Sequence, residues 1–122
     1  MLVEFGDMLR DMDQNMQQPL YELRIYKANP GKIDALLTRF RDHTVNLFSK
    51  HRMESIGYWI SVNEPDVLMY IIKHNGIPTD NWQAFIEDPV WIEAKATSEV
   101  NGALVDSIES HYLTPTDFSK LK

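Results

Sequence analysis

The run Tyr21-Glu22-Leu23-Arg24-Ile25-Tyr26, then Asn29-Pro30-Gly31, then residues 32–51, decides the fold of this chain. The first run alternates as a strand does, with Tyr21, Leu23 and Ile25 on one face and Glu22, Arg24 and Tyr26 on the other. Asn29 is expected to cap a helix whose first residue is Pro30. The apolar stripe of that helix is Ile33, Leu36, Leu37, Phe40, Thr44, Leu47 and Phe48.

Later residues complete one known motif. The turn formers Asn63-Glu64-Pro65-Asp66 indicate a hairpin, and Asn101-Gly102 ends the last helix. The further elements are expected as strands at about 54–62 and 67–74, a short helix after Thr79 or Asp80, a helix capped by Asp88 from Pro89 towards Val100, and a strand at about 103–113. The order β-α-β-β-α-β predicts an α+β, ferredoxin-like fold, in which two helices cover one face of a four-stranded antiparallel sheet.

The second face of that sheet needs a cover. The strand at 67–74 is apolar at every position from Val67 to Ile72, so both of its faces are expected to be buried. Nothing else in the chain is large enough to cover the face that the helices leave open. A second copy can do so by packing sheet against sheet around a two-fold axis. We therefore expect a homodimer, a dimeric α/β barrel.

Length and composition narrow the class of protein. The chain has 122 residues, enough for one domain, and 43% of them are hydrophobic. It has no cysteine, which excludes disulfides and thiolate chemistry, and its net charge of -6 argues against nucleic acid as a partner. No apolar run is long enough to span a membrane, and residues 1–18 lack a signal-peptide pattern, so we expect a cytoplasmic protein.

The chain is expected to divide into three parts. Residues 1–19 form a methionine-rich amphipathic arm, interpreted either as a frayed extension or as an arm that docks on the same or a partner subunit. Residues 20–119 form the domain, and residues 120–122 are a tail.

Two histidines are candidate catalytic residues. His43 lies at the border of the helical stripe, where an imidazole facing a cavity would act as a base, a donor or a metal ligand. His74 ends the third strand and is a candidate for the same pocket. The simpler interpretation makes His43 an edge residue bonded to a neighbour. No metal-ligand spacing occurs, and neither a metal nor a cofactor is expected.

The candidate ligand-binding residues are aromatic, with one arginine. Tyr58, Trp59, Tyr70 and Trp82 are expected either to form the walls of a pocket or to be core. Arg24 is expected to pair with Glu22 or with Glu109 of the last strand, which shares a face with His111. The alternative is that Arg24 binds the carboxylate of a substrate.

Several motifs in this order resemble the NIPSNAP domain, from about Leu20 to Ser119. They are Tyr21-Glu22-Leu23-Arg24-x-Tyr26, Pro30-Gly31-Lys32, Arg39-Phe40-Arg41-Asp42-His43-Thr44, Gly57-Tyr58-Trp59, Trp82-x-x-Phe85, Asp88-Pro89-x-Trp91 and Tyr112-Leu113-Thr114-Pro115-Thr116-Asp117. The resemblance implies a place in the dimeric α/β-barrel superfamily, which includes small monooxygenases and haem-binding proteins. Members of the family are linked mainly to vesicle or mitochondrial roles, and many bacterial members have no assigned activity. One departure is Arg52, where family members tend to have glycine, so that the local turn loses its usual left-handed residue.

Three functions follow as hypotheses. The first is a homodimeric NIPSNAP-like protein of unassigned activity that binds a small apolar or aromatic ligand between sheet and helices. The second is a cofactor-independent oxygenase or isomerase with His43 as its base. The third is a protein-protein interaction module that uses the methionine-rich arm.

Overall fold

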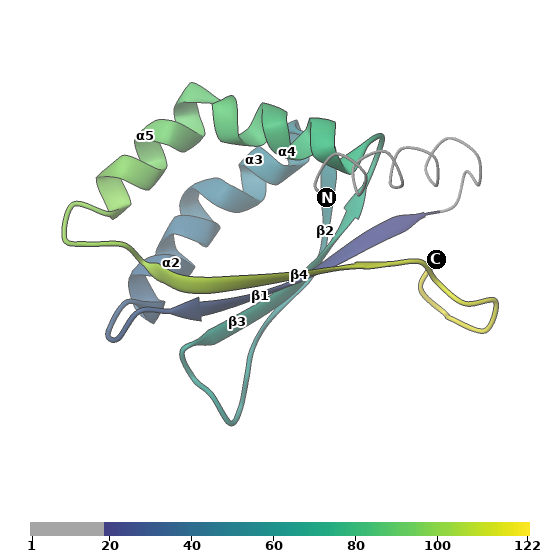
Figure 1. Ribbon diagram of the computed structural model, residues 1–122, viewed down its shortest axis with the longest axis horizontal. Helices are drawn as coiled ribbons and strands as arrows, with labels where there is room; N and C mark the ends of the chain where they lie inside the picture. Colours follow the sequence, from purple (N-terminus) through teal and green to yellow (C-terminus); the bar gives the residue numbers. More distant parts are fainter. Residues whose placement is uncertain (1–18) are drawn as a thin grey trace.

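A single sheet backed by helices on one side makes up the protein in the computed structural model, which describes residues 19–122 (Figure 1). The strands are β1 (Leu20–Ala28), β2 (Met53–Ile60), β3 (Val67–His74) and β4 (Val105–Leu113). They are ordered β2-β3-β1-β4, and each neighbouring pair is antiparallel. The ferredoxin-like α+β fold is confirmed. The predicted arm lies outside the described residues except for Pro19.

The first helical segment runs from Ile33 to Lys50 and contains a wider turn. It consists of α2 (Ile33–Arg39), the π-helical turn η1 (Phe40–Thr44) and α3 (Val45–Lys50). The amide of Val45 donates to the carbonyl of Phe40, five residues back, instead of four. The predicted stripe is confirmed as the buried face, since five of its members are buried and the other two pack against the core: Leu36, Phe40, Thr44, Leu47 and Phe48, then Ile33 and Leu37.

The residues that cap the helices agree only in part with those expected from the sequence. Asp88 caps α5 (Pro89–Ser98) as expected, accepting from the amide of Val90 at 2.8 Å. Asn29 does not cap α2, because the left-handed Gly31 (φ 75°) separates it from the helix, and its amide donates to the carbonyl of Ala103. The expected caps of α4 (Pro78–Glu87) are also wrong, since Pro78 already occupies its first turn and the cap position is one residue earlier.

The turn after α3 keeps its left-handed residue without glycine. Arg52 has a φ of 67°, and its carbonyl accepts from the amide of Asn75 at 2.9 Å. The preceding residues also hold the helix layer together, because Lys50 and His51 both contact the Asp88 carboxylate, at 2.8 and 2.7 Å. These two hydrogen bonds, with the one from the Val90 amide, hold the pKa of Asp88 well below its usual range.

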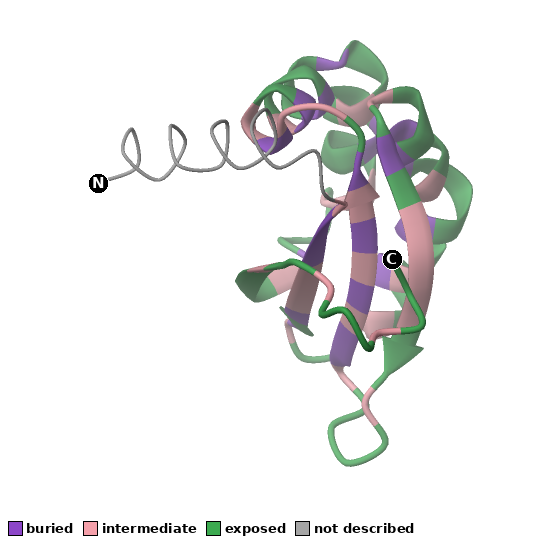
Figure 2. Ribbon diagram, turned by 90° about the vertical axis from the view of Figure 1, so that its right-hand side faces the viewer, coloured by how far each residue is buried: buried purple, intermediate pink, exposed green. Residues whose placement is uncertain are grey.

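Along the strands, residues that face the helices alternate with residues on the side of the sheet that the helices leave uncovered. Buried and intermediate residues follow one another along β3, visible as bands in Figure 2. Leu68, Tyr70 and Ile72 belong to the core beneath the helices, with Phe40 and Phe48 above them. The alternate residues form what we call the open face: Leu23, Ile25, Met69, Ile71 and Trp59, with Glu109 and His111 of β4 beside them.

Candidate functional site

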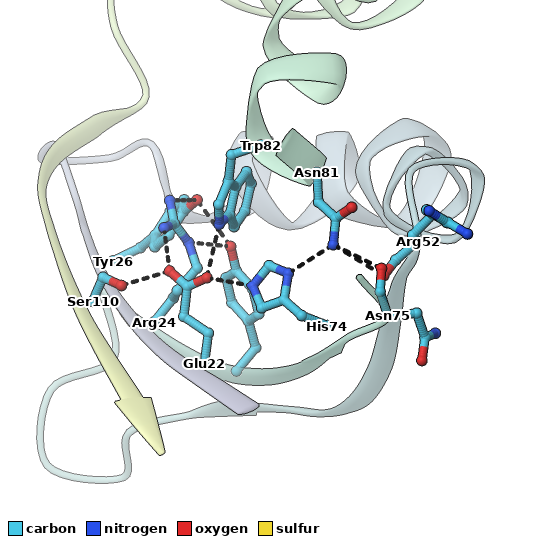
Figure 3. Close-up of polar contacts among 10 residues, drawn as sticks. Glu22, Arg24, Tyr26, Arg52, His74, Asn75, Asn81, Trp82 and Ser110 are labelled. Carbon is cyan, nitrogen blue, oxygen red and sulfur yellow. Dashed lines mark hydrogen bonds and ion pairs between the residues drawn. The ribbon is translucent and has the colours of Figure 1, made fainter. Parts of the chain in front are cut away.

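A charged network lies beneath the helices on the covered face of the sheet (Figure 3). Its centre is Glu22 of β1, which is only 1% exposed. One carboxylate oxygen accepts from His74 Nε2 at 2.8 Å and from Trp82 Nε1 at 2.7 Å. The other accepts from Arg24 Nη1 at 2.9 Å and from the Ser110 hydroxyl. The carboxylate thus has four donors from three strands and one helix, which fixes these elements relative to one another.

The partners of Glu22 keep it ionised. Burial alone would raise its pKa, but the hydrogen bond from His74, the charge of Arg24 and the bonds from Ser110 and Trp82 lower the pKa to about 2, from an ordinary 4.5. A buried charge is tolerated only when it is paired and hydrogen-bonded, and this one is both.

Asn81 of α4 determines which ring nitrogen of His74 carries the proton. Its side-chain amide nitrogen lies 3.1 Å from His74 Nδ1 and 3.2 Å from the carbonyl of Asn75 (Figure 3). A nitrogen that donates to a backbone carbonyl is correctly oriented as NH₂, so it also donates to Nδ1. Nδ1 is therefore an acceptor, and Nε2 donates its proton to Glu22. The arrangement orients the imidazole rather than exposing it.

Arg24 extends the network to two tyrosines. Its Nε donates to the hydroxyl of Tyr70 at 2.8 Å and its Nη2 to that of Tyr26 at 3.0 Å, while its guanidinium lies 4.2 Å from the ring of Trp82. The two hydroxyls are 2.9 Å apart and share one hydrogen bond. Two phenolic protons serve that one contact, so one of them has no acceptor among residues 19–122.

A cavity of about 400 Å³ opens between the helices and the β4 side of the sheet. Five aromatic side chains line it: Tyr26, Phe40, Phe48, Phe85 and Trp91. Of the two hydrogen-bonded tyrosines, Tyr26 lines this cavity and Tyr70 does not. Its spare proton, if the pair's hydrogen bond runs from Tyr70 to Tyr26, is available to an occupant. The cavity has the size and the mostly apolar lining of a small-molecule site.

Arg39 is the most buried charged residue of the cavity wall, at 4% exposure. Its Nη1 lies 3.2 Å from both the Ser98 hydroxyl and Glu99 Oε2, and its Cζ is 5.0 Å from the ring centroid of Trp91. Burial would raise the pKa of Glu99, but hydrogen bonds from Lys95 and Arg39 lower it. The Nε of Arg39 is buried and has no hydrogen-bond partner among the described residues.

The wider η1 turn explains why Arg39 is buried. In a regular α-helix, Arg39 and Thr44 would project about 140° apart around the axis. The π turn reduces this angle, so both are buried and both line the cavity, with the Thr44 hydroxyl 3.4 Å from the Arg39 carbonyl. Such turns occur frequently at functional sites.

The structure brings together only some of the residues predicted from sequence. Arg24, Tyr70, Trp82 and His74 meet in the network, although none of them lines the cavity. Arg24 pairs with Glu22, as one of the two expected partners, and not with Glu109, which lies on the open face opposite Ile25.

The other predicted residues lie apart. Tyr58 stacks on Tyr70 with ring centroids 5.2 Å apart, and Trp59 lies on the open face. His43 is exposed in a groove between α2 and α5, so it shares no pocket with His74. In the part of the chain that the structure describes, no group of acidic residues and histidines has the arrangement of a metal site. No described helix is long and apolar enough to cross a membrane.

None of the residues predicted as a site lines the cavity, and three of its wall residues show why. Tyr26 was placed on a strand face with Glu22 and Arg24, but nothing marked it as a wall residue. Arg39 stands one place before the stripe residue Phe40, and its burial depends on the π turn, which the apolar period does not reveal. Trp91 was assigned only to its helix. The signal that was available is the cluster of aromatic residues on helices that flank one strand.

Comparisons with known proteins agree with this fold. A family model described as NIPSNAP matches residues 21–120. A NIPSNAP family protein of unknown function from Agrobacterium tumefaciens is 22% identical and has a TM-score of 0.73, over 86% of this chain and 95% of that one. An uncharacterised NIPSNAP-like domain protein from Burkholderia xenovorans is 16% identical, with a TM-score of 0.72 over 84% and 89%.

A more distant likeness extends the fold beyond that family. A protein named as a candidate antibiotic biosynthesis monooxygenase from Chloroflexus aurantiacus is 15% identical, with a TM-score of 0.56 over 85% of this chain and 99% of that one. At such identities a shared structure is evidence of fold alone. A search of the curated proteins finds no match. Since the family model covers nearly the whole of the described chain, this protein belongs to the NIPSNAP family.

Proposed function

We propose that this protein binds a small apolar or aromatic molecule in the cavity between the helices and β4. The observation that carries the proposal is the cavity of about 400 Å³ with its aromatic wall. A flat apolar molecule placed there would contact rings on several sides, while the spare phenolic proton at Tyr26 would bind one acceptor atom. The network behind Tyr26 supports a fixed position for its hydroxyl, because Arg24 donates to it.

The two other hypotheses have less support. A base at His43 would need to reach the bound molecule, and His43 is exposed outside the cavity wall. The interaction module depends on the arm at residues 1–19, nearly all of which lies outside the described residues. The cytoplasmic location stays a prediction.

We also propose that the protein works as a homodimer joined through the open face. Leu23, Ile25, Met69 and Ile71 are half-buried there, and Trp59 is 54% exposed. A contiguous apolar surface of this kind on one sheet is typical of an interface, and an apolar patch can pack against its own copy.

A neutral fluorescent probe tests the ligand-binding proposal. N-phenyl-1-naphthylamine is expected to bind one molecule per chain, with increased emission on entering an apolar site. The variant Ile108→Trp places an indole at the half-exposed β4 wall, on the covered face opposite Tyr26, and should reduce probe affinity at least tenfold. Ile92→Trp makes the same change at an exposed position of α5 outside the cavity and should leave affinity unchanged.

Two results would count against the proposal. One is a wild-type protein that leaves probe emission at the level of free dye. The other is equal affinity in the two tryptophan variants, which would place the bound dye elsewhere on the protein.

A further inference from the structure

The guanidinium of Arg39 has one nitrogen, Nη1, in use and one buried nitrogen, Nε, unpaired. Nη1 contacts Ser98 and Glu99, whereas Nε has no hydrogen-bond partner in residues 19–122. Nε–H and one N–H of Nη2 point in parallel, and this pair is one of the edges by which arginine binds a carboxylate in bidentate fashion. The edge that contains the unpaired Nε therefore matches a carboxylate.

Leaving Nε without a hydrogen-bond partner is costly. A buried N–H without an acceptor loses its hydrogen bonds to water and gains none from the protein. The same residue is 4% exposed and belongs to the wall of the cavity. The aromatic residues Phe40, Phe85 and Trp91 of that wall offer it no hydrogen-bond acceptor. An occupant that carries its own acceptor would remove this cost.

The net charge of the cavity wall would not by itself favour an anionic ligand over a neutral one. Arg39 and Lys95 are the cations of the wall, and Glu99 and the exposed Asp106 are its anions. Glu99 is shared, because its two oxygens contact Lys95 Nζ at 3.1 Å and Arg39 Nη1 at 3.2 Å. The wall is thus close to neutral, and a preference for an anion must come from local geometry at the Nε–Nη2 edge of Arg39.

We propose that the ligand of this cavity is an aromatic carboxylate whose anionic group binds the Nε–Nη2 edge of Arg39, on which Nε has no partner among the described residues. The proposal rests on the proposed function, since it names the chemical class of the molecule that the cavity holds. The apolar body packs against the aromatic wall, and the carboxylate contacts Arg39. Tyr26, in the same cavity wall, remains available to a second polar atom of the ligand.

A pair of probes with the same shape and different charge separates the two proposals. The test measures binding of 2-naphthoate and of its neutral amide, 2-naphthamide, by isothermal titration calorimetry with the full chain. For the wild-type protein we expect the carboxylate to bind at least tenfold more tightly than the amide, as charge-assisted bidentate bonds do. Arg39→Gln should bind the two probes with equal affinity.

Two further variants make the result specific. Arg41→Gln removes the same charge from an exposed position two residues along the chain, and it should keep the full preference. Arg39→Lys keeps the charge but removes the planar guanidinium that binds a carboxylate through two nitrogens, so it should lose most of the preference for 2-naphthoate. This variant also provides the test if Arg39→Gln does not fold. Circular dichroism establishes that each variant is folded.

Each outcome decides one of the proposals. If the wild-type protein binds both naphthalenes equally, or if Arg39→Gln and Arg39→Lys retain the preference, the carboxylate assignment is wrong and the ligand-binding proposal stands. If the wild-type protein binds neither probe, while N-phenyl-1-naphthylamine also fails to bind, the proposed function itself is overturned.

Discussion

Glu22 is a single carboxylate on which the polar interior of the covered face depends. It holds His74, Trp82, Arg24 and Ser110 at once, and it is 1% exposed. Removing one partner from a buried ion pair leaves the other charge without compensation, which costs about 3–5 kcal/mol. If Glu22 were replaced, the uncompensated charge would be that of Arg24, because its other hydrogen bonds go to neutral hydroxyls.

We expect acid to destabilise the protein through Glu22. Its folded-state pKa of about 2 lies below the ordinary 4.5, so the unfolded chain takes up a proton at pH values where the folded chain does not. The stability that Glu22 contributes is therefore complete above pH ~5 and is lost as the pH falls towards ~2, on the order of 3 kcal/mol in all. Urea unfolding of the wild-type protein between pH 7 and pH 2.5 measures this loss.

The variant Glu22→Gln isolates the contribution. It should be less stable than the wild-type protein by about 3 kcal/mol at pH 7, and the difference between the two should shrink as the pH falls. Glu54→Gln changes an exposed carboxylate in the same way and should stay within about 0.5 kcal/mol of the wild-type protein. A difference between Glu22→Gln and the wild-type protein that does not change with pH would contradict the argument.

Among the elements, the η1 turn has the clearest consequence for the site. A π turn is equivalent to one extra residue in an α-helix, and the helix on either side keeps its own buried face. Leu36 and Phe40 lie before the extra residue and Leu47 and Phe48 after it, and all four belong to the core. The extra residue thus changes the cavity wall without displacing the core contacts.

Deleting Asp42 should turn this segment into a continuous α-helix. Asp42 is exposed within η1, so we expect a folded protein that loses less than about 2 kcal/mol of stability, because the buried apolar residues keep their faces. Binding of 2-naphthoate should fall at least tenfold, since Arg39 and Thr44 no longer share the cavity wall. Urea unfolding and calorimetry measure the two effects.

Deletion of Ala35 is the matched control. This residue is also exposed, but it precedes Leu36 and Phe40. If the π turn became a regular turn to compensate for the missing residue, the segment that carries Leu36 and Phe40 would still be rotated by about 100° relative to the sheet. Each displaced core side chain costs about 1.5–3 kcal/mol. Equal losses of stability in the two deletion variants would mean that η1 is not an inserted residue.

The order of elements could be predicted from sequence because each apolar period and turn signal is local. The choice between the two faces of β1 could not. Both faces of that strand carry large side chains, and the charged face became the covered one because Glu22 and Arg24 find partners on four different elements. Such long-range pairing is invisible to a pattern of period two.

The candidate site was predictable only as a class of residues. Aromatic residues between sheet and helices were expected, and the cavity is lined by such residues, but by Phe40, Phe85 and Trp91 rather than by Tyr58, Trp59 or Trp82. Trp59 faces away because it is in register with Met69 and Ile25 on the open face, where its ring lies over Gly57 and leaves no room for a Cβ there. The spacing along a strand assigns a face, but it does not say which face the helices cover.

For the molecule as a whole, the two faces of the sheet differ in what covers them. The helices bury Leu68, Tyr70 and Ile72 on one side, while on the other side, among the described residues, only the C-terminal residues 113–121 come up against Tyr21 and Ile71 (Figure 2). Ile71 stands at the centre of this open face, paired with Leu23 on one side and Gly57 on the other. A second copy packed against it would bury the surface that one chain leaves half-covered.

Size-exclusion chromatography with light scattering should therefore give about twice the chain mass of 14.2 kDa for the wild-type protein at micromolar concentration. Ile71→Lys places a charge at the centre of the open face and should shift the mass towards that of one chain, because a buried, unpaired ammonium opposes association. The same change at Ile92, 54% exposed on α5, should leave the dimer intact. A wild-type protein with the mass of one chain, or an Ile71→Lys variant that remains a dimer, would show that the open face is not the interface. The dimer would then have to form elsewhere or not at all, and the half-buried side chains of β1 and β3 would need another explanation.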